Sequence, residues 1–470
     1  MRGSATANII AFCATGLLAS LGFASAPAAD PGADLIVTAA PVYVPRAELQ
    51  GQERFPKGAH LLLLHAGIAT PLLPEFAASA DADVFFDGAR VLFAGKQKPA
   101  DPWQIWELDL KDHSVRKVVT TATDAERPLY LPAGRMVYAL RTSAGFNLDS
   151  NDDGHPLAYT PLNPTTDPGE LQLVYVHASA FPTDILKDGR VLFESAYPLG
   201  DGAAPEMYLV YPDGSGLESY RCDHGRARWG GTQLSSGDVV FTHGASLARF
   251  TSPLAHEVRI AAPPAEYAGA IAETAAGDWL ISARTQANPR YVIKLWKPGS
   301  TAMQTLFAQS GENLLEPVLV AARKPPTRFP SGLHPWDYAN LLALDARLSR
   351  DGALQGTPSH VRLETLDAAG HAVLMGTAPV EKDGSFFIKV PGNQPIRLSL
   401  LDAKGHVLRQ EHGWFFSRGG EQRICVGCHT GPERASENRV PEVLLQTTTP
   451  VDLTVAPRHT LALHAGTGGR

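Results

Sequence analysis

The sequence predicts an all-β protein in which a β-propeller is followed by a small β-sandwich-like domain. Three observations support this fold class. The 470-residue chain contains 43 glycines and 37 prolines, a composition that favours short strands joined by tight turns. A turn-and-strand pattern recurs through roughly the first two thirds of the chain, and short alternating strands continue beyond it. The length itself exceeds what one hydrophobic core usually serves.

The recurring unit is a glycine turn followed by an apolar strand. Its five copies begin at Asp87-Gly88, Ala133-Gly134, Asp188-Gly189, Ser236-Gly237 and Ala276-Gly277. Successive glycines lie 46, 55, 48 and 40 residues apart. Glycine allows the positive φ of a hairpin turn, and the apolar residues after it suit an inner strand. Repeats of this length with several strands each are typical of a β-propeller.

We predict that the propeller occupies residues 35–325 and has six blades, with five or seven as alternatives. The sixth blade would combine residues near 40–70 with a strand at 317–321. An irregular β-sandwich is the other interpretation of the repeats.

A proline-rich stretch, Lys324-Pro325-Pro326, is interpreted as a linker to the second domain. Residues 326–410 contain short alternating strands and glycine turns and are predicted to form a β-sandwich-like domain. Residues 411–450 follow as a separate C-terminal segment, and residues 451–470 as a tail.

The N-terminus has the features of a secretory signal peptide. Met1-Arg2 is positively charged, residues 9–23 are mostly apolar, and Ala26-Pro27-Ala28 offers a cleavage site. A membrane anchor is the alternative, but the apolar stretch is short for a span. We therefore expect cleavage of residues 1–28, a periplasmic or secreted protein, and no membrane span after cleavage.

The formal net charge of −7 makes the surface mildly acidic. Nucleic-acid-binding proteins need a basic surface, so no nucleic acid is expected as a partner.

The strongest motif is Cys425-Val-Gly-Cys428-His429. Two thiols at this spacing can both reach one porphyrin, and the adjacent imidazole can bind its iron. A zinc site would need a second ligand pair at similar spacing, and a redox dithiol would need a βαβ context, neither of which the sequence contains. The motif predicts one covalent haem c, with His429 as an iron ligand, in residues 411–450.

The residues before this motif could line the haem. Trp414 would contribute an apolar wall, and Arg418 and Arg423 could pair with the haem propionates. The alternative is that the aromatic residues fill the core of the sandwich.

A polar run could bind calcium. Asp149, Asn151 and Asp153 alternate before Gly154, as oxygen ligands do in Ca²⁺ loops. The twelfth position is Thr160 rather than glutamate, so the run is not an EF-hand, and a solvated polar loop is the alternative.

The segment from Trp414 through Arg418, Glu421 and Arg423 to the Cys-His motif, placed after a propeller and a sandwich, resembles the hydrazine synthase alpha subunit-like family. The resemblance covers residues 80–445. It implies a possible zinc ion between Cys222 and His429, completed by an acidic residue such as Asp81, Asp83 or Asp87.

An inert, buried Cys222 is the alternative to that zinc site. The sequence also departs from the family, because Glu433 stands where the synthase has a tyrosine ligand to the iron. Because of this departure, and because the chain has a single haem motif, hydrazine synthesis is not expected of it.

Two functions follow from a single haem. The first is electron transfer, with a redox partner protein or a small redox molecule as partner. The second is a haem enzyme or sensor that acts on a small redox compound, for example a nitrogen compound, at an open iron site under the propeller. The sequence assigns no catalytic residue.

Overall fold

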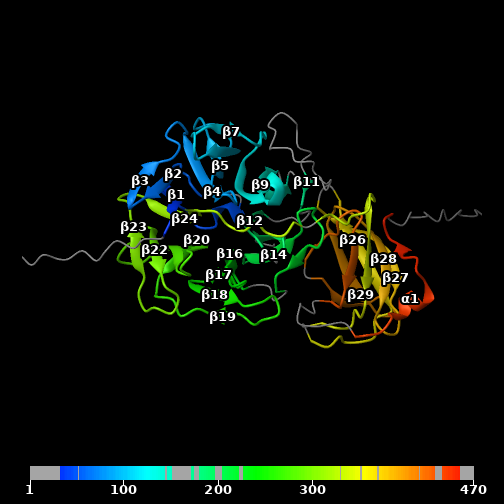
Figure 1. The fold of residues 1–470 in the computed structure, drawn as a ribbon. Coiled ribbons are helices and arrows are strands. Elements are labelled where there is room, and N and C mark those ends of the chain that lie inside the picture. The colour runs from blue at the N-terminus through cyan, green and yellow to red at the C-terminus, as the bar shows by residue number, and fades with distance from the viewer. Residues whose placement is uncertain are drawn as a thin grey trace, which may run out of the picture.

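The computed structural model describes residues 32–50, 52–142, 145–150, 171–173, 179–195, 204–221, 226–328, 330–349, 352–367, 370–411, 413–428 and 437–455. Within these ranges the chain is almost entirely β-sheet, with one short helix, α1 (Glu442–Gln446), and two 3-10 turns, η1 (Ala47–Gln50) and η2 (Pro132–Gly134). The predicted all-β fold, a propeller followed by a sandwich-like domain, is confirmed (Figure 1). In the described part of the chain, no helix is long and apolar enough to cross a membrane.

Six four-stranded sheets are found among the described residues from 34 to 320, and neighbouring sheets pack side by side in a ring. The sheet that closes the ring contains β24 (Asn313–Val320), β1 (Asp34–Ala40), β2 (His60–His65) and β3 (Ile68–Pro71). The next two contain β4 (Ala78–Val84), β5 (Arg90–Lys96), β6 (Gln104–Asp109) and β7 (Val115–Lys117), then β8 (Ala125–Leu131), β9 (Arg135–Thr142), β10 (Gly145–Ser150) and β11 (Leu171–Gln172).

The remaining three sheets of the ring continue in the same order along the chain. They contain β12 (Ala180–Ile185), β13 (Val191–Ser195), β14 (Glu206–Val210) and β15 (Glu218–Ser219), then β16 (Arg228–Gln233), β17 (Val239–His243), β18 (Ser246–Phe250) and β19 (Val258–Arg259), and then β20 (Glu266–Glu273), β21 (Trp279–Arg284), β22 (Val292–Trp296) and β23 (Gln304–Phe307). The glycines predicted to open the five repeats all have positive φ, between 74° and 97°. The five repeat turns therefore have the positive φ that the sequence predicted.

The ring is closed by hydrogen bonds between its first and last strands. Strand β24 pairs antiparallel with β1, with Leu35 opposite Leu319 and Ala39 opposite Leu314. Three strands of this sheet come from the start of the ring and one from its end, which is the combination that the sequence suggested for residues near 40–70 and 317–321.

The second domain packs two sheets face to face around one apolar core (Figure 1, yellow to red). One contains β31 (Gln422–Cys425), β25 (Tyr338–Ala343), β28 (Phe386–Pro391) and β32 (Val451–Asp452), and the other contains β27 (Ala372–Pro379), β26 (His360–Leu366), β29 (Ile396–Leu401) and β30 (Val407–Gln410). The segment 411–450 therefore contributes an edge strand, β31, to the sandwich. That strand brings Cys425 to the core.

Candidate functional site

Cys425 and Cys428 lie at one end of the sandwich. Cys425 ends strand β31, which runs parallel to β25 with Cys425 opposite Ala343, and the Leu344 N–H donates to the Cys425 carbonyl over 2.8 Å. Both cysteines are half-buried free thiols that pack against the apolar core between the two sheets. The strand pairing thus fixes where the first thiol lies, and Cys428 follows it by three residues.

Both thiols are held in their protonated form. Burial raises the pKa of the Cys425 thiol, although the Arg423 guanidinium opposes this. Burial, with the negative charge of Glu411, raises the pKa of the Cys428 thiol to about 12. Redox dithiols instead have a lowered thiol pKa.

A small hollow opens beside Cys428 between the two sheets. Its apolar walls are formed by Val361, Phe386, Leu398 and Leu400. Two charged side chains, Arg409 and Glu411, complete the lining. The Arg409 Nη1 atom is buried without a hydrogen-bond partner. Apolar walls, two thiols and a guanidinium with an unused donor are the groups that a covalently attached haem and its propionates would need, so the described residues fit the predicted cofactor.

The predicted aromatic flank is divided between two cores. Phe416 is fully buried in the propeller among residues such as Phe193 and Val210, whereas Phe415 packs against the sandwich core. Trp414 is half-buried, and the guanidinium carbon of Arg397 lies over it, 4.5 Å from the centre of the Trp414 ring. Phe415 therefore packs in the sandwich, as the alternative interpretation of this flank expected, whereas Phe416 packs in the propeller, which neither interpretation expected.

The predicted arginines lie where this segment meets the propeller. Arg423 Nη2 donates to the Leu217 carbonyl over 2.6 Å, and the Arg418 side chain passes beside Gly214. Glu421 joins the two domains: its Oε1 accepts from the Gly216 N–H over 3.2 Å and its Oε2 from the Arg418 N–H over 2.7 Å. These contacts fasten β31 to the turn between β14 and β15.

Sequence analysis missed Glu421 and Arg409. Glu421 was part of the motif that carried the family resemblance, so its position was visible although its role as a joint was not. Arg409 lies in an ordinary alternating strand, and nothing in the local sequence distinguishes it from other surface arginines.

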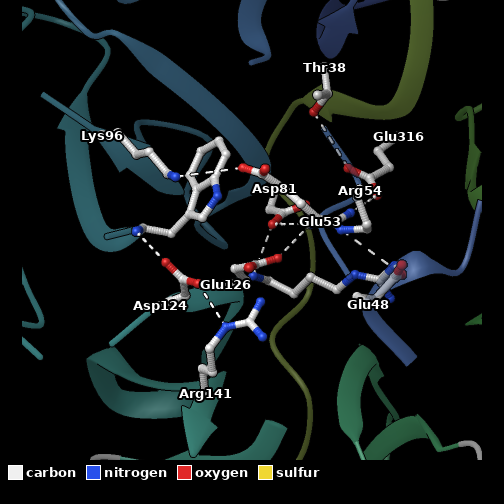
Figure 2. Close-up of polar contacts among 12 residues, drawn as sticks. Thr38, Glu48, Glu53, Arg54, Asp81, Lys96, Asp124, Glu126, Arg141 and Glu316 are labelled. Carbon is white, nitrogen blue, oxygen red and sulfur yellow. Dashed lines mark hydrogen bonds and ion pairs between the residues drawn. The ribbon is translucent and has the colours of Figure 1, made fainter. Parts of the chain in front are cut away.

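The acidic residues suggested for zinc have protein partners. Both Asp81 oxygens accept from Arg54 Nη2, over 2.7 and 2.6 Å, in a buried cluster (Figure 2). Asp83 accepts from Arg323 and the Tyr130 N–H, and Asp87 accepts from the Ala89 N–H in an exposed turn. Among the described residues, no group of three or more His, Cys, Asp or Glu is arranged to hold a metal ion.

Several predicted site residues lie outside the described residues. These are Cys222, His429, Asn151, Asp153 and the signal peptide 1–28. The backbone of Asp149 is described on β10, opposite Tyr138. The calcium prediction and the Cys222–His429 zinc prediction therefore stay predictions.

The structure thus defines a propeller protein whose C-terminal sandwich holds a pair of free cysteines at its apolar core. Residues 346–430 match the family described as "Hydrazine synthase alpha subunit middle domain", a range that contains Cys425, Cys428 and most of the sandwich. This match confirms the predicted resemblance to the hydrazine synthase alpha subunit-like family over residues 346–430.

Solved structures agree with this assignment at the level of the fold. Kuenenia stuttgartiensis hydrazine synthase superposes with a TM-score of 0.75 at 17% identity, covering 89% of this chain and 71% of that chain. TolB from Acinetobacter baumannii gives a TM-score of 0.45 at 11% identity, covering 62% of this chain and 67% of that chain, which is too weak to support an argument. No curated protein matches the chain in a sequence search.

Proposed function

We propose that the protein is an exported electron-transfer protein with one c-type haem, attached through Cys425 and Cys428 and ligated by His429. The observation that carries the proposal is the pair of free thiols at the apolar core of the sandwich, directly before a histidine in the sequence. The signal-like N-terminus supports export, which covalent haem attachment requires.

The described residues have separate tasks in this proposal. Cys425 and Cys428 would hold the haem edge, and apolar side chains beside Cys428, such as Phe386 and Leu400, would contact it. Arg409 Nη1, buried and unpaired, would meet a propionate. Arg423, in contrast, is engaged with Leu217 of the propeller and would hold the motif in place. A haem so held supplies a one-electron couple whose potential depends on its ligands and burial.

Haem staining on a denaturing gel tests the attachment. The protein is produced with its own signal in a host that matures c-type cytochromes, together with the Cys425→Ala/Cys428→Ala double variant. We expect a stained band for the wild type and none for the double variant. The matched control, Cys222→Ala, should stain as the wild type does. A stained double variant would contradict the assignment.

An optical spectrum of the reduced protein, with and without CO, separates electron transfer from the second candidate function. Two firm axial ligands would give a low-spin spectrum that CO does not change, as electron transfer requires. A high-spin spectrum that shifts with CO would show an open iron position and would replace the proposal with a haem enzyme or sensor for a small redox compound.

A further inference from the structure

The loop between β1 and β2 covers one end of the propeller axis and touches all six sheets of the ring. We call its described residues, 41–50 and 52–59, the plug. Its contacts, sheet by sheet, are Arg54 with Asp81, Glu48 with Arg127, Leu49 with the cluster of Ala139 and Phe181, Arg46 over Trp229, Tyr43 with Tyr291, and Arg54 with Glu316. This loop joins two neighbouring strands, but its contacts with every blade also place it to close the axis.

The inner strands of the ring present charged side chains to the plug because they bulge. The register of each inner strand is interrupted once, and in five of the six a residue with positive φ lies at or beside the interruption: Asp81, Arg127, Gly230, Gly269 and Glu316. A bulge redirects the side chain of the extra residue. Three of these five residues are charged, and all three belong to one cluster with Arg54.

Arg54 of the plug is the centre of the cluster. Its Nη2 donates to both Asp81 oxygens and lies 3.4 Å from Glu126 Oε2, and its Nη1 lies 3.1 Å from Glu316 Oε1 (Figure 2). The Arg54 side chain is 1% exposed and that of Asp81 4% exposed. Thr38 adds a hydroxyl near Glu316 Oε2.

A second guanidinium lies beside the first. Arg127 Nη2 pairs with Glu48 of the plug, and Arg127 Nη1 lies 2.5 Å from Glu194 Oε1. The described cluster thus holds five carboxyl groups, of Glu48, Asp81, Glu126, Glu194 and Glu316, but two guanidinium groups. Uncompensated buried charge is strongly unfavourable, so a cluster with more acids than bases is expected to retain protons.

We propose that the plug is a proton-dependent closure of the propeller axis, held in place when Glu126 and Glu316 carry protons and loosened when both ionise. Glu316 faces Arg54, Asp81 and Arg127 as charged neighbours, with Gly269 packed against its side chain. Glu126 faces Arg54, Asp81, Asp124 and Glu48. For each glutamate, ionisation therefore adds a negative charge beside existing negative charges.

The titration of the two glutamates agrees with this geometry. Burial, with the negative charge of Asp81, raises the pKa of Glu316 to about 7. Burial also raises the pKa of Glu126 to about 7, against the opposing effect of Arg54. A carboxyl group with a raised pKa in the folded state stabilises that state below its ordinary pKa, and this contribution is lost as the pH rises through about 7. The plug should consequently open on the alkaline side.

Hydrogen–deuterium exchange of peptides covering residues 41–59 tests the proposal. Exchange is measured on the full-length protein at pH 5.5 and pH 8.5, and each rate is corrected for the intrinsic pH dependence of amide exchange. We expect protection of the plug to fall at least about tenfold at pH 8.5, since one proton linked over one pH unit corresponds to a tenfold change. Peptides from β26 and β29 in the sandwich should be unchanged.

The Glu126→Gln/Glu316→Gln double variant should keep the plug protected at pH 8.5, because glutamine resembles the protonated acid. The matched control is Glu53→Gln, also in the plug but at an exposed ion pair with Lys96, which should follow the wild type. Wild-type protection that is equal at both pH values would overturn the proposal, and this result does not depend on whether the variants fold.

Discussion

The fully buried Phe416 gives the clearest quantitative test of how the two domains are joined. It lies in the chain between β30 and β31 of the sandwich but packs in the propeller, at 0% exposure, against residues that include Leu131, Phe193 and Val210. Replacement by alanine removes the ring and leaves a cavity in a core that Phe416 enters from another domain. Such substitutions cost about 3–5 kcal/mol. We expect Phe416→Ala to lose that amount of unfolding free energy.

The assay is equilibrium urea unfolding followed by tryptophan fluorescence, with Phe387→Ala as the matched control. Phe387 is a half-buried phenylalanine on β28 of the sandwich, so its loss should cost clearly less. The same experiment reports on coupling: a weakened joint should separate the unfolding of the propeller from that of the sandwich. A loss below about 1 kcal/mol for Phe416→Ala would refute the reasoning, because it would mean that the ring contributes little to the propeller core.

Two further substitutions test the plug and the repeat turns by thermal or urea unfolding. Arg54→Met should cost about 3–5 kcal/mol, because it removes the guanidinium that pairs with the buried Asp81 carboxylate, whereas Arg259→Met at an exposed ion pair should cost less than about 1 kcal/mol. Equal losses would contradict a buried role for Arg54. Gly88→Ala should cost more than Gly67→Ala: both have φ near 80°, but a Cβ at Gly88 would lie 3.0 Å from the backbone after β24, and one at Gly67 would meet no atom within 4 Å. Equal melting temperatures for the two variants would show that the close approach at Gly88 does not affect stability.

The propeller could be predicted because each of its repeats depends on residues that are close together in the sequence. Each glycine turn needs a residue that tolerates positive φ, and the structure shows positive φ at all five predicted glycines. The cysteine pair could be singled out for the same reason, since Cys425 and Cys428 are close in the chain, and the haem that it predicts stays a prediction. In both cases the physical requirement lies within a few residues.

The plug and the domain joint could not be predicted, because their partners are distant in sequence. Arg54 and Glu316 are 262 residues apart, and Gly216 and Glu421 are 205 apart. A charged residue in a loop normally faces water, so nothing local in residues 41–59 indicated a buried Arg54. Likewise, two adjacent phenylalanines, Phe415 and Phe416, gave no sign that each belongs to a different core.

The pairing of β1 with β24 has a consequence for how the chain can be made. Strand β1 ends at Ala40 and its partner begins at Asn313, so at about 5–20 residues per second the partner is synthesised roughly 14–55 s later. Until then one edge of β1 has no neighbour, and unpaired strand edges promote aggregation. The growing chain therefore needs protection of its earliest strand, by a chaperone or by delayed folding, until the last strand of the ring arrives.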